Sequence, residues 1–221
     1  VLGAARPDKD SVCLKLHSPG GTVTGYGLAA AQLERLRKAK VDLTVCVDEV
    51  AASGGYMMAA VANKIISAPF ATIGSIGVVV EMPNYHKLLE TLGVNFIVST
   101  AGESKRTVTP WTEVTVEKEA KLKKKLEEIH VMFKNHIAKF RPDLDLSVVA
   151  TGDTWPGSTA HELNLVDEVM TSEEFLLSKV ETHDVYTIEV PSHHHKSRIG
   201  AAVSELIDVV AEKMIQANLR M

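Results

Sequence analysis

The chain has little of several features that mark particular classes of protein. It has two cysteines, Cys13 and Cys46, and because both stand in apolar alternating runs and fit no metal or redox spacing, we interpret them as core thiols. The net charge of −4 argues against nucleic acid or an anionic membrane surface as a partner. No apolar run approaches the roughly 18 residues that cross a bilayer, and no signal peptide is visible.

The rest of the composition is that of a globular protein. Hydrophobic residues make up 45% of the 221 and charged residues 24%. A chain of this length and composition can bury a core as one domain of ordinary size with an appendage. We expect the domain over residues 1–183 and a strand-and-helix extension over residues 184–221.

Strand-like and helix-like patterns alternate over the first hundred residues. Residues 43–48, LTVCVD, are largely apolar, which is typical of a strand buried on both faces of a parallel sheet. Other expected elements are strands at 11–17, 64–68 and 94–99, a β-branched stretch at 72–80, and helices at 25–40, 53–62 and 87–92. In the helix at 25–40, Leu28, Leu33 and Leu36 share an apolar face. The alternation predicts an α/β fold in which right-handed βαβ units form a mostly parallel sheet.

Residues 113–140 form a predicted long amphipathic helix. Its apolar residues fall on one stripe made of Leu122, Leu126, Ile129, Phe133 and Ile137. Lysines at 121 and 123–125 are interleaved with glutamates, which indicates a solvated helix face and not a nucleic-acid site.

The last forty residues carry a weaker signal. An apolar stripe over 199–219 predicts a C-terminal helical extension, and residues 185–190 read as a strand. His193, His194 and His195 stand between them. Because consecutive side chains diverge and no acidic or cysteine partner stands at ligand spacing, we predict a polar loop and no metal site.

A serine followed by two glycines opens the predicted helix at 53–62, in the stretch VAASGGYMMAAVA. The unpaired N–H groups at the start of a helix point toward the position of the Ser53 hydroxyl. Such a place suits a nucleophile whose reaction develops negative charge. The alternative is that Ser53 simply caps the helix. Gly54 and Gly55 favour the nucleophile, because each costs a helix about 0.5–1 kcal/mol relative to alanine and so indicates close approach to the backbone.

A second glycine turn, Ser18-Pro19-Gly20-Gly21, follows the strand at 11–17. Ligands bind at the carboxyl edge of open parallel sheets, and both this turn and Ser53 should lie there. The backbone amides of Gly20 and Gly54 would then form an oxyanion hole. Taken alone, such a turn is a weak signal.

A nucleophilic serine also needs a base. None of the nine histidines stands in a context typical of a Ser-His-Asp arrangement. Lys105 follows a predicted strand in STAGESKRTVTP, and burial can lower a lysine pKa from about 10.4 toward 7 or 8, where it acts as a base. The alternative is an exposed loop lysine.

The motifs SPGG, DEVAASGGYMMA, APFATIGSIGV, TAGESKRTVTP and ELNLVDEV occur in this order over residues 11–180. In this combination the chain closely resembles the S49 family of serine peptidases, which includes the signal peptide peptidase A enzymes, and most of all the SohB branch of putative inner-membrane peptidases. The resemblance implies a ClpP/crotonase-like fold and a Ser-Lys dyad. Ser53 matches the nucleophile, Lys105 the general base and Ser75 a serine that orients the lysine amine, while Gly20 and Gly54 match the oxyanion hole.

The resemblance further implies an enzyme without a cofactor that cuts unfolded or membrane-derived peptides, such as signal-peptide remnants. It implies a homo-oligomer at the bacterial inner membrane, with the peptidase domain on the periplasmic side. Family members usually carry a membrane segment and further β structure before the SPGG strand, so we expect this chain to be a fragment whose anchor is missing. Because Ser53 and Lys105 are encoded close together, we expect each subunit to carry a complete dyad.

Two other functions fit the same fold. A crotonase-type acyl-CoA enzyme uses the oxyanion hole without a serine nucleophile, and the pairing of Ser53 with Lys105 argues against it. A non-catalytic adaptor or membrane quality-control protein would be marked by loss of the serine or the lysine, and both are present.

Overall fold

The computed structural model describes residues 5–7, 9–102 and 105–188. It divides the chain into two compact units, Val1–His183 and Asp184–Met221. Of the second unit only residues 184–188 are described, and these five form neither helix nor strand, so the strand predicted over 185–190 is wrong for its described part. The three histidines at 193–195 and the helix predicted over 199–219 lie outside the described residues.

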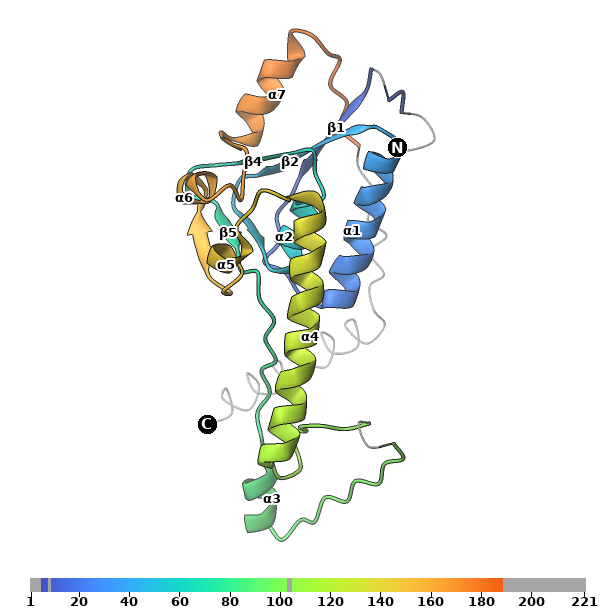
Figure 1. The fold of residues 1–221 in the computed structure, drawn as a ribbon, viewed down its shortest axis with the longest axis vertical. Helices are drawn as coiled ribbons and strands as arrows, with labels where there is room; N and C mark the ends of the chain where they lie inside the picture. Colours follow the sequence, from blue (N-terminus) through green and yellow to red (C-terminus); the bar gives the residue numbers. More distant parts are fainter. Residues whose placement is uncertain (1–4, 8, 103–104, 189–221) are drawn as a thin grey trace, which may run out of the picture. The chain divides into compact units, whose positions relative to one another are not determined.

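The first unit contains two sheets (Figure 1). The larger has the order β1-β2-β4-β7 and is entirely parallel: β1 is Ser11–Lys15, β2 Asp42–Val47, β4 Lys64–Ser67 and β7 Glu168–Val169. The smaller has the order β3-β5-β6, with β3 at Val50–Ala52, β5 at Thr72–Gly74 and β6 at Thr154–Pro156. Strands β3 and β5 are parallel and β6 is antiparallel to β5. The predicted α/β fold with a mostly parallel sheet is therefore confirmed.

Seven helices are present in the described residues: α1 is Val23–Lys38, α2 Gly54–Ala59, α3 His86–Thr91, α4 Val116–Phe140, α5 Leu146–Val149, α6 Gly157–Glu162 and α7 Ser172–Val180. The residues that cap the N-termini of α4 and α7 are of the types that commonly begin helices. The Thr115 hydroxyl accepts the Lys118 amide at the start of α4. Thr171 and Glu174 form a reciprocal capping box at α7, which satisfies amides that have no partner within the helix.

The core lies between the larger sheet and its helices. Strand β2 is buried at five successive positions, as its apolar sequence predicts, and Tyr56 of α2 is fully buried, with its hydroxyl donating to Leu165 O at 2.7 Å. One predicted core position is wrong, because Leu28 is 65% exposed. Helix α1 buries only the side of the helix that faces the sheet and α2, which includes Ala30 and Leu36.

Helix α4 packs on the core through its second half only. Phe133 and Ile137 are buried, whereas Leu122 and Leu126 of the predicted stripe are half-exposed. His136 Nε2 donates to Met57 O at 3.0 Å, and His130 Nε2 donates to Ile76 O at 3.2 Å. The long helix is confirmed, and its first turns extend beyond the core.

The chain between β5 and α4, residues 79–115, forms a segment that we call the arm. The Tyr85 amide donates to Pro110 O at 2.6 Å, and the rings of Tyr85 and Trp111 stack with centroids 5.3 Å apart. Figure 1 shows the arm in green beside the first turns of α4. The strand predicted at 94–99 is wrong: these residues form no strand and are exposed.

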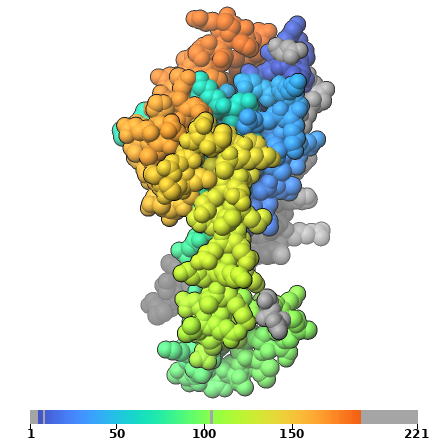
Figure 2. Space-filling model, viewed as in Figure 1, coloured from blue at the N-terminus to red at the C-terminus, as the bar shows by residue number. Residues whose placement is uncertain are grey.

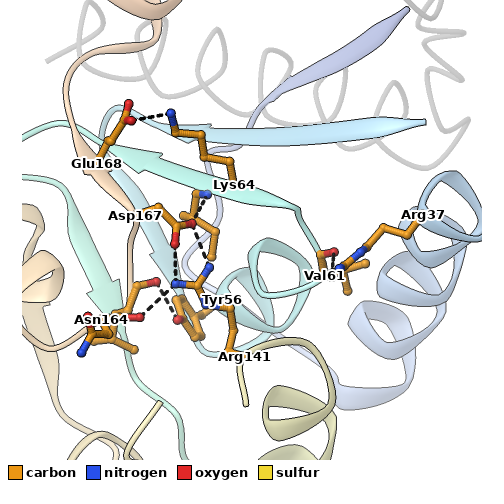
Figure 3. Close-up of polar contacts among 10 residues, drawn as sticks. Arg37, Tyr56, Val61, Lys64, Arg141, Asn164, Asp167 and Glu168 are labelled. Atoms are coloured by element: carbon orange, nitrogen blue, oxygen red, sulfur yellow. Dashed lines mark hydrogen bonds and ion pairs between the residues drawn. The ribbon is translucent and has the colours of Figure 1, made fainter. Parts of the chain in front are cut away.

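An ion pair fixes the end of α4 to the larger sheet (Figure 3). Arg141 donates to both carboxylate oxygens of Asp167 at 2.8 Å, and Asp167 also accepts the Ile65 amide at 2.7 Å. Burial by itself raises the pKa of Asp167, but the hydrogen bonds from Arg141 and Ile65 outweigh burial and hold the pKa below its ordinary value. This end of α4 is therefore anchored, in contrast to the end that meets the arm.

Candidate active site

Ser53 occupies a strained turn between β3 and α2. Its backbone has φ 52° and ψ −119°, a conformation that L-residues rarely adopt. The Ser53 amide donates to Gly74 O at 2.8 Å, and its carbonyl accepts the Met57 amide at 3.0 Å. Such strain costs about 1–3 kcal/mol and clusters at functional sites. A sharp strand-to-helix turn of this kind presents a serine hydroxyl at the edge of a sheet.

The Ser53 side chain does not cap α2. It forms no capping hydrogen bond, and the residue is half-buried. The alternative interpretation, that the Ser53 side chain caps the helix, is therefore wrong. The hydroxyl is not used in a capping hydrogen bond and is left available for a substrate.

Gly20 lies directly against Ser53, although the strands that precede them, β1 and β3, belong to different sheets; a parallel bridge between Ser18 and Ala51 brings the two segments together. A Cβ built on Gly20 would fall 2.7 Å from Ser53 Cβ and 3.0 Å from Gly54 N. Gly20 also has φ +99°. Only glycine combines that conformation with so close an approach. The structure thus brings together three of the predicted site residues: the serine and the two glycines whose amides were expected to form the oxyanion hole.

Ser75 lies beside Ser53 in the smaller sheet. The parallel register pairs Ala52 with Gly74, so Ser53 and Ser75 are the next residues along β3 and β5. The Ser75 amide donates to Asp153 O at 2.6 Å. Ser75 is half-buried and, like Ser53, has a positive φ, 53°. Ser53 and Ser75 therefore directly follow neighbouring parallel strands at the same end of the smaller sheet.

Lys105 does not lie near Ser53 and Ser75. It is exposed and lies in the arm, where its amide donates to Gly102 O at 3.2 Å. Among the described residues its amine makes no hydrogen bond or ion pair with Ser53 or Ser75. The arm joins α4 at Val116, and from there to His130, which contacts the chain next to Ser75, the helix rises roughly 21 Å. A complete dyad within one chain stays a prediction.

Tyr26, which contacts both the SPGG turn and the start of α2, was not identified from the sequence. Its hydroxyl lies 2.7 Å from Ser18 Oγ, and its ring lies against Gly54. The only available signal was an aromatic residue between Gly25 and Gly27, eight positions after the SPGG serine.

Among the residues that the structure describes, no cysteine or histidine forms a hydrogen bond with Ser53 or Ser75. Cys13 and Cys46 lie on adjacent strands with Sγ atoms 3.5 Å apart and are free thiols, one half-buried and one buried. Within the ranges that the structure describes, no three histidine, cysteine or acidic residues are grouped so as to hold one metal ion.

Comparison with known proteins gives a consistent family assignment. The model of peptidase family S49 matches residues 35–185, and the model of the family's N-terminal region matches residues 1–33. A probable protease SohB of Haemophilus influenzae is 50% identical over 189 residues, which cover 86% of this chain and 53% of the relative. A probable protease SohB of Buchnera aphidicola from Schlechtendalia chinensis is 49% identical over 79% of this chain and 57% of its own.

A more distant relative is a putative protease of Methanocaldococcus jannaschii, which is 34% identical over 75% of this chain and 53% of its own. The chain spans about half the length of the curated relatives it matches. Across the described ranges, no helix combines the length and the apolar character that a membrane span requires.

Proposed function

This chain belongs to peptidase family S49, and from that membership together with the geometry at Ser53 we propose that it is a serine endopeptidase. Its substrates are unfolded or membrane-derived peptides, including signal-peptide remnants. The observation that carries the proposal is the uncapped Ser53 hydroxyl on a strained turn, with Gly20 and Gly54 packed against it.

The proposed reaction is acyl transfer. Ser53 Oγ attacks the peptide carbonyl carbon while its proton passes to a base, and the resulting oxyanion accepts hydrogen bonds from the amides of Gly20 and Gly54. Collapse of this intermediate breaks the C–N bond, the leaving amine takes the proton, and water then hydrolyses the acyl-enzyme. Each oxyanion donor is worth about 3 kcal/mol in the transition state.

We assign the base to Lys105 and its orientation to Ser75. Because the arm holds Lys105 away from Ser53 within one chain, catalysis requires an arm to reach the Ser53 edge. That arm belongs either to the same chain or to a second copy. Ser75, which leaves the sheet beside Ser53, is placed to accept a hydrogen bond from the arriving amine.

Mixing two inactive variants identifies which arm supplies the lysine. Ser53→Ala and Lys105→Ala are each purified and then combined. Recovery of activity on mixing means that the lysine crosses between copies. Absence of recovery, beside an active wild type and a demonstrated exchange of subunits, means that the arm of the same chain closes.

We also propose that the protein is a homo-oligomer assembled through the arm. Thirteen large, exposed apolar side chains of the described residues lie between Val79 and Val116, among them Ile97 at 79% and Leu92 at 65%. Apolar surface gathered in this way marks interaction sites. Figure 2 shows the arm and the adjoining turns of α4 at the surface, in green and yellow-green.

The location at the bacterial inner membrane, with the peptidase domain in the periplasm and an anchor outside this chain, is likewise a proposal. It is tested by fractionating cells that make the full-length protein and by adding an external protease to spheroplasts. Digestion of the peptidase domain in intact spheroplasts supports the periplasmic side, and protection places the domain in the cytoplasm.

The experiment that tests the peptidase activity is cleavage of an unfolded protein and of a fluorogenic apolar peptide, with Ser53→Ala as the matched control. Cleavage that depends on Ser53 supports the proposal. If the wild-type chain and a version extended at its N-terminus both fail to cut, the non-catalytic adaptor becomes the better account.

A further inference from the structure

The two chain segments that carry the oxyanion amides meet around one aromatic ring. A Cβ built on Gly54 would fall 2.4 Å from Tyr26 Cγ, and one built on Gly21 would fall 2.9 Å from Tyr26 Cε2. The Tyr26 ring, projecting from the first turn of α1, therefore packs on the backbone of both segments, at Gly21 and at Gly54. It lies beside the place where Gly20 directly meets Ser53 and supports that contact.

The hydroxyl of the same side chain connects to the Gly20 amide. Tyr26 Oη lies 2.7 Å from Ser18 Oγ, and Ser18 Oγ accepts the Gly20 amide at 3.3 Å. Tyr26 therefore restrains the rotation of the Ser18 hydroxyl group. The position of Ser18 Oγ in turn determines whether the Gly20 amide has a hydrogen-bond acceptor within its own chain. The long distance matters as well, because a 3.3 Å hydrogen bond is weak and is readily given up to a charged oxygen.

Ser18 itself is held firmly by its backbone. Its amide donates to Val50 O at 2.9 Å, its carbonyl accepts the Ala52 amide at 3.0 Å, and it is 6% exposed. A Cβ built on Gly55 would fall 2.4 Å from Ser18 O. Ser18 is thus fixed to β3 and α2, the two elements on either side of Ser53, and Tyr26 is the side chain that connects it to α1.

We propose that Tyr26, acting through Ser18, is a positioning residue for the oxyanion hole. The ring packs on Gly21 and Gly54 beside the contact between Gly20 and Ser53, and the hydroxyl holds Ser18 Oγ, which keeps the Gly20 amide in place until the developing oxyanion accepts it. This inference rests on the proposed peptidase function. Its physical basis is that oxyanion donors act only when held about 2.7–3.1 Å from the developing charge, so small displacements reduce the rate.

Two substitutions test the role of the hydroxyl while the ring stays in place. Tyr26→Phe keeps the ring and removes the bond to Ser18, whereas Ser18→Ala removes the same bond from the other side. Tyr186→Phe is the matched control, because Tyr186 is 81% exposed in the second unit. For each variant we would measure kcat, KM, melting temperature and affinity for a peptide aldehyde, which adds to Ser53 and places its oxygen in the oxyanion hole.

The proposal expects Tyr26→Phe to lower kcat about tenfold, less than the roughly hundredfold or more that loss of a donor costs. The aldehyde should bind more weakly by the same factor, while KM and the affinity for the unreactive peptide amide stay within about twofold. The double variant Tyr26→Phe with Ser18→Ala should be no worse than Ser18→Ala alone, because Ser18→Ala already removes the bond to Tyr26 together with the acceptor of the Gly20 amide. Tyr186→Phe should match wild type.

Two results would overturn the proposal in distinguishable ways. If wild type shows turnover that depends on Ser53 but Tyr26→Phe retains its kcat and aldehyde affinity, Tyr26 is only a packing residue and the peptidase function stands. If wild type shows no turnover that depends on Ser53 and no aldehyde binding, the peptidase function fails and this inference fails with it.

Discussion

Ser53 and Ser75 stand side by side, each one residue beyond the last paired position of two parallel strands, and their φ angles are 52° and 53°. Two neighbouring non-glycine residues in this conformation are unusual. The Ser53 amide donates to Gly74 O, the carbonyl just before Ser75, so the two turns support one another. Backbone strain clusters at functional sites, so the positive φ angles at these two adjacent positions support the roles proposed for the two serines.

The first prediction concerns the strain at Ser53. Both Ser53→Ala and Ser53→Gly should abolish peptide cleavage, because each removes the nucleophile. Their stabilities should differ, since glycine adopts a positive φ without steric cost: we expect Ser53→Gly to be about 1 kcal/mol more stable than Ser53→Ala in urea denaturation. Equal stability would show that the turn relaxes when the hydroxyl is removed.

The second prediction concerns Gly20. Gly20→Ala should reduce cleavage by roughly a hundredfold or more, because the new methyl group would meet Ser53 Cβ and displace an oxyanion amide. Gly93→Ala is the control, since Gly93 also has positive φ, +67°, but no atom lies within 4 Å of its added Cβ. Gly93→Ala should lower the melting temperature through backbone strain and, because its methyl group meets no atom near Ser53, reduce kcat far less than Gly20→Ala does. Full activity in Gly20→Ala would remove Gly20 from the oxyanion hole.

The third prediction concerns Ser75. Ser75→Ala should lower kcat about tenfold, less than the loss caused by Ser53→Ala, because in the proposed mechanism Ser75 orients the base and does not react itself. The melting temperature should change little, since the backbone hydrogen bonds at residue 75 remain. Steady-state kinetics with the fluorogenic peptide measures this difference, and an unchanged kcat would make Ser75 a structural turn residue.

The fourth prediction follows from the ion pair between Arg141 and Asp167. The pKa of Asp167 is lowered in the folded chain, so its contribution to stability is fully present above the unfolded pKa of about 3.9 and is lost as pH falls through the folded value. Asp167→Asn should destabilise the chain by about 1–2 kcal/mol at pH 7.

Urea denaturation between pH 7 and pH 2 measures this effect. The difference in stability between wild type and Asp167→Asn should shrink toward the acid end. Glu127→Gln, which changes an exposed carboxylate on α4, should be close to wild type throughout. A difference that stays constant with pH would assign the effect of Asp167→Asn to packing.

The fifth prediction concerns the arm. Ile97→Glu with Leu92→Glu should reduce the oligomer to smaller species in size-exclusion chromatography with light scattering, because charge is placed in an apolar interface. Leu177→Glu is matched in exposure, at 70% on α7, and should assemble like wild type. A monomeric wild type, or an oligomer indifferent to the arm variants, would exclude the arm as the interface.

The sequence predicted the elements whose residues have a strong local pattern. Strand β2 is continuous apolar sequence buried on both faces. The meeting of Gly20 with Ser53 was predicted from strands of one sheet, but it arises from a bridge between Ser18 and Ala51 of β3, which lies in the smaller sheet. Strands β3 and β6 were not predicted, because three residues are too few for a periodicity. Residues 94–99 have β-branched and aromatic side chains but no strand partner among the described residues, and propensity alone does not make a strand.

The parts of the site that were not predicted depend on distances between segments far apart in sequence. Nothing local to Tyr26 indicates that its ring lies against Gly54, twenty-eight positions later. Likewise, the closeness of Ser53 and Lys105 in sequence does not give their separation in space. That separation arises because α4 packs on the core through its second half only.

Helix α4 is therefore a lever as well as a packing element. Its pivot lies where His136 contacts Met57 O and His130 contacts Ile76 O, within a few residues of both site serines. A tilt of about 10° at His130 would move the arm end at Val116 by roughly 4 Å. In the proposed mechanism, a small change in the tilt of α4 beside Ser53 and Ser75 is therefore a larger displacement of the arm, which carries Lys105.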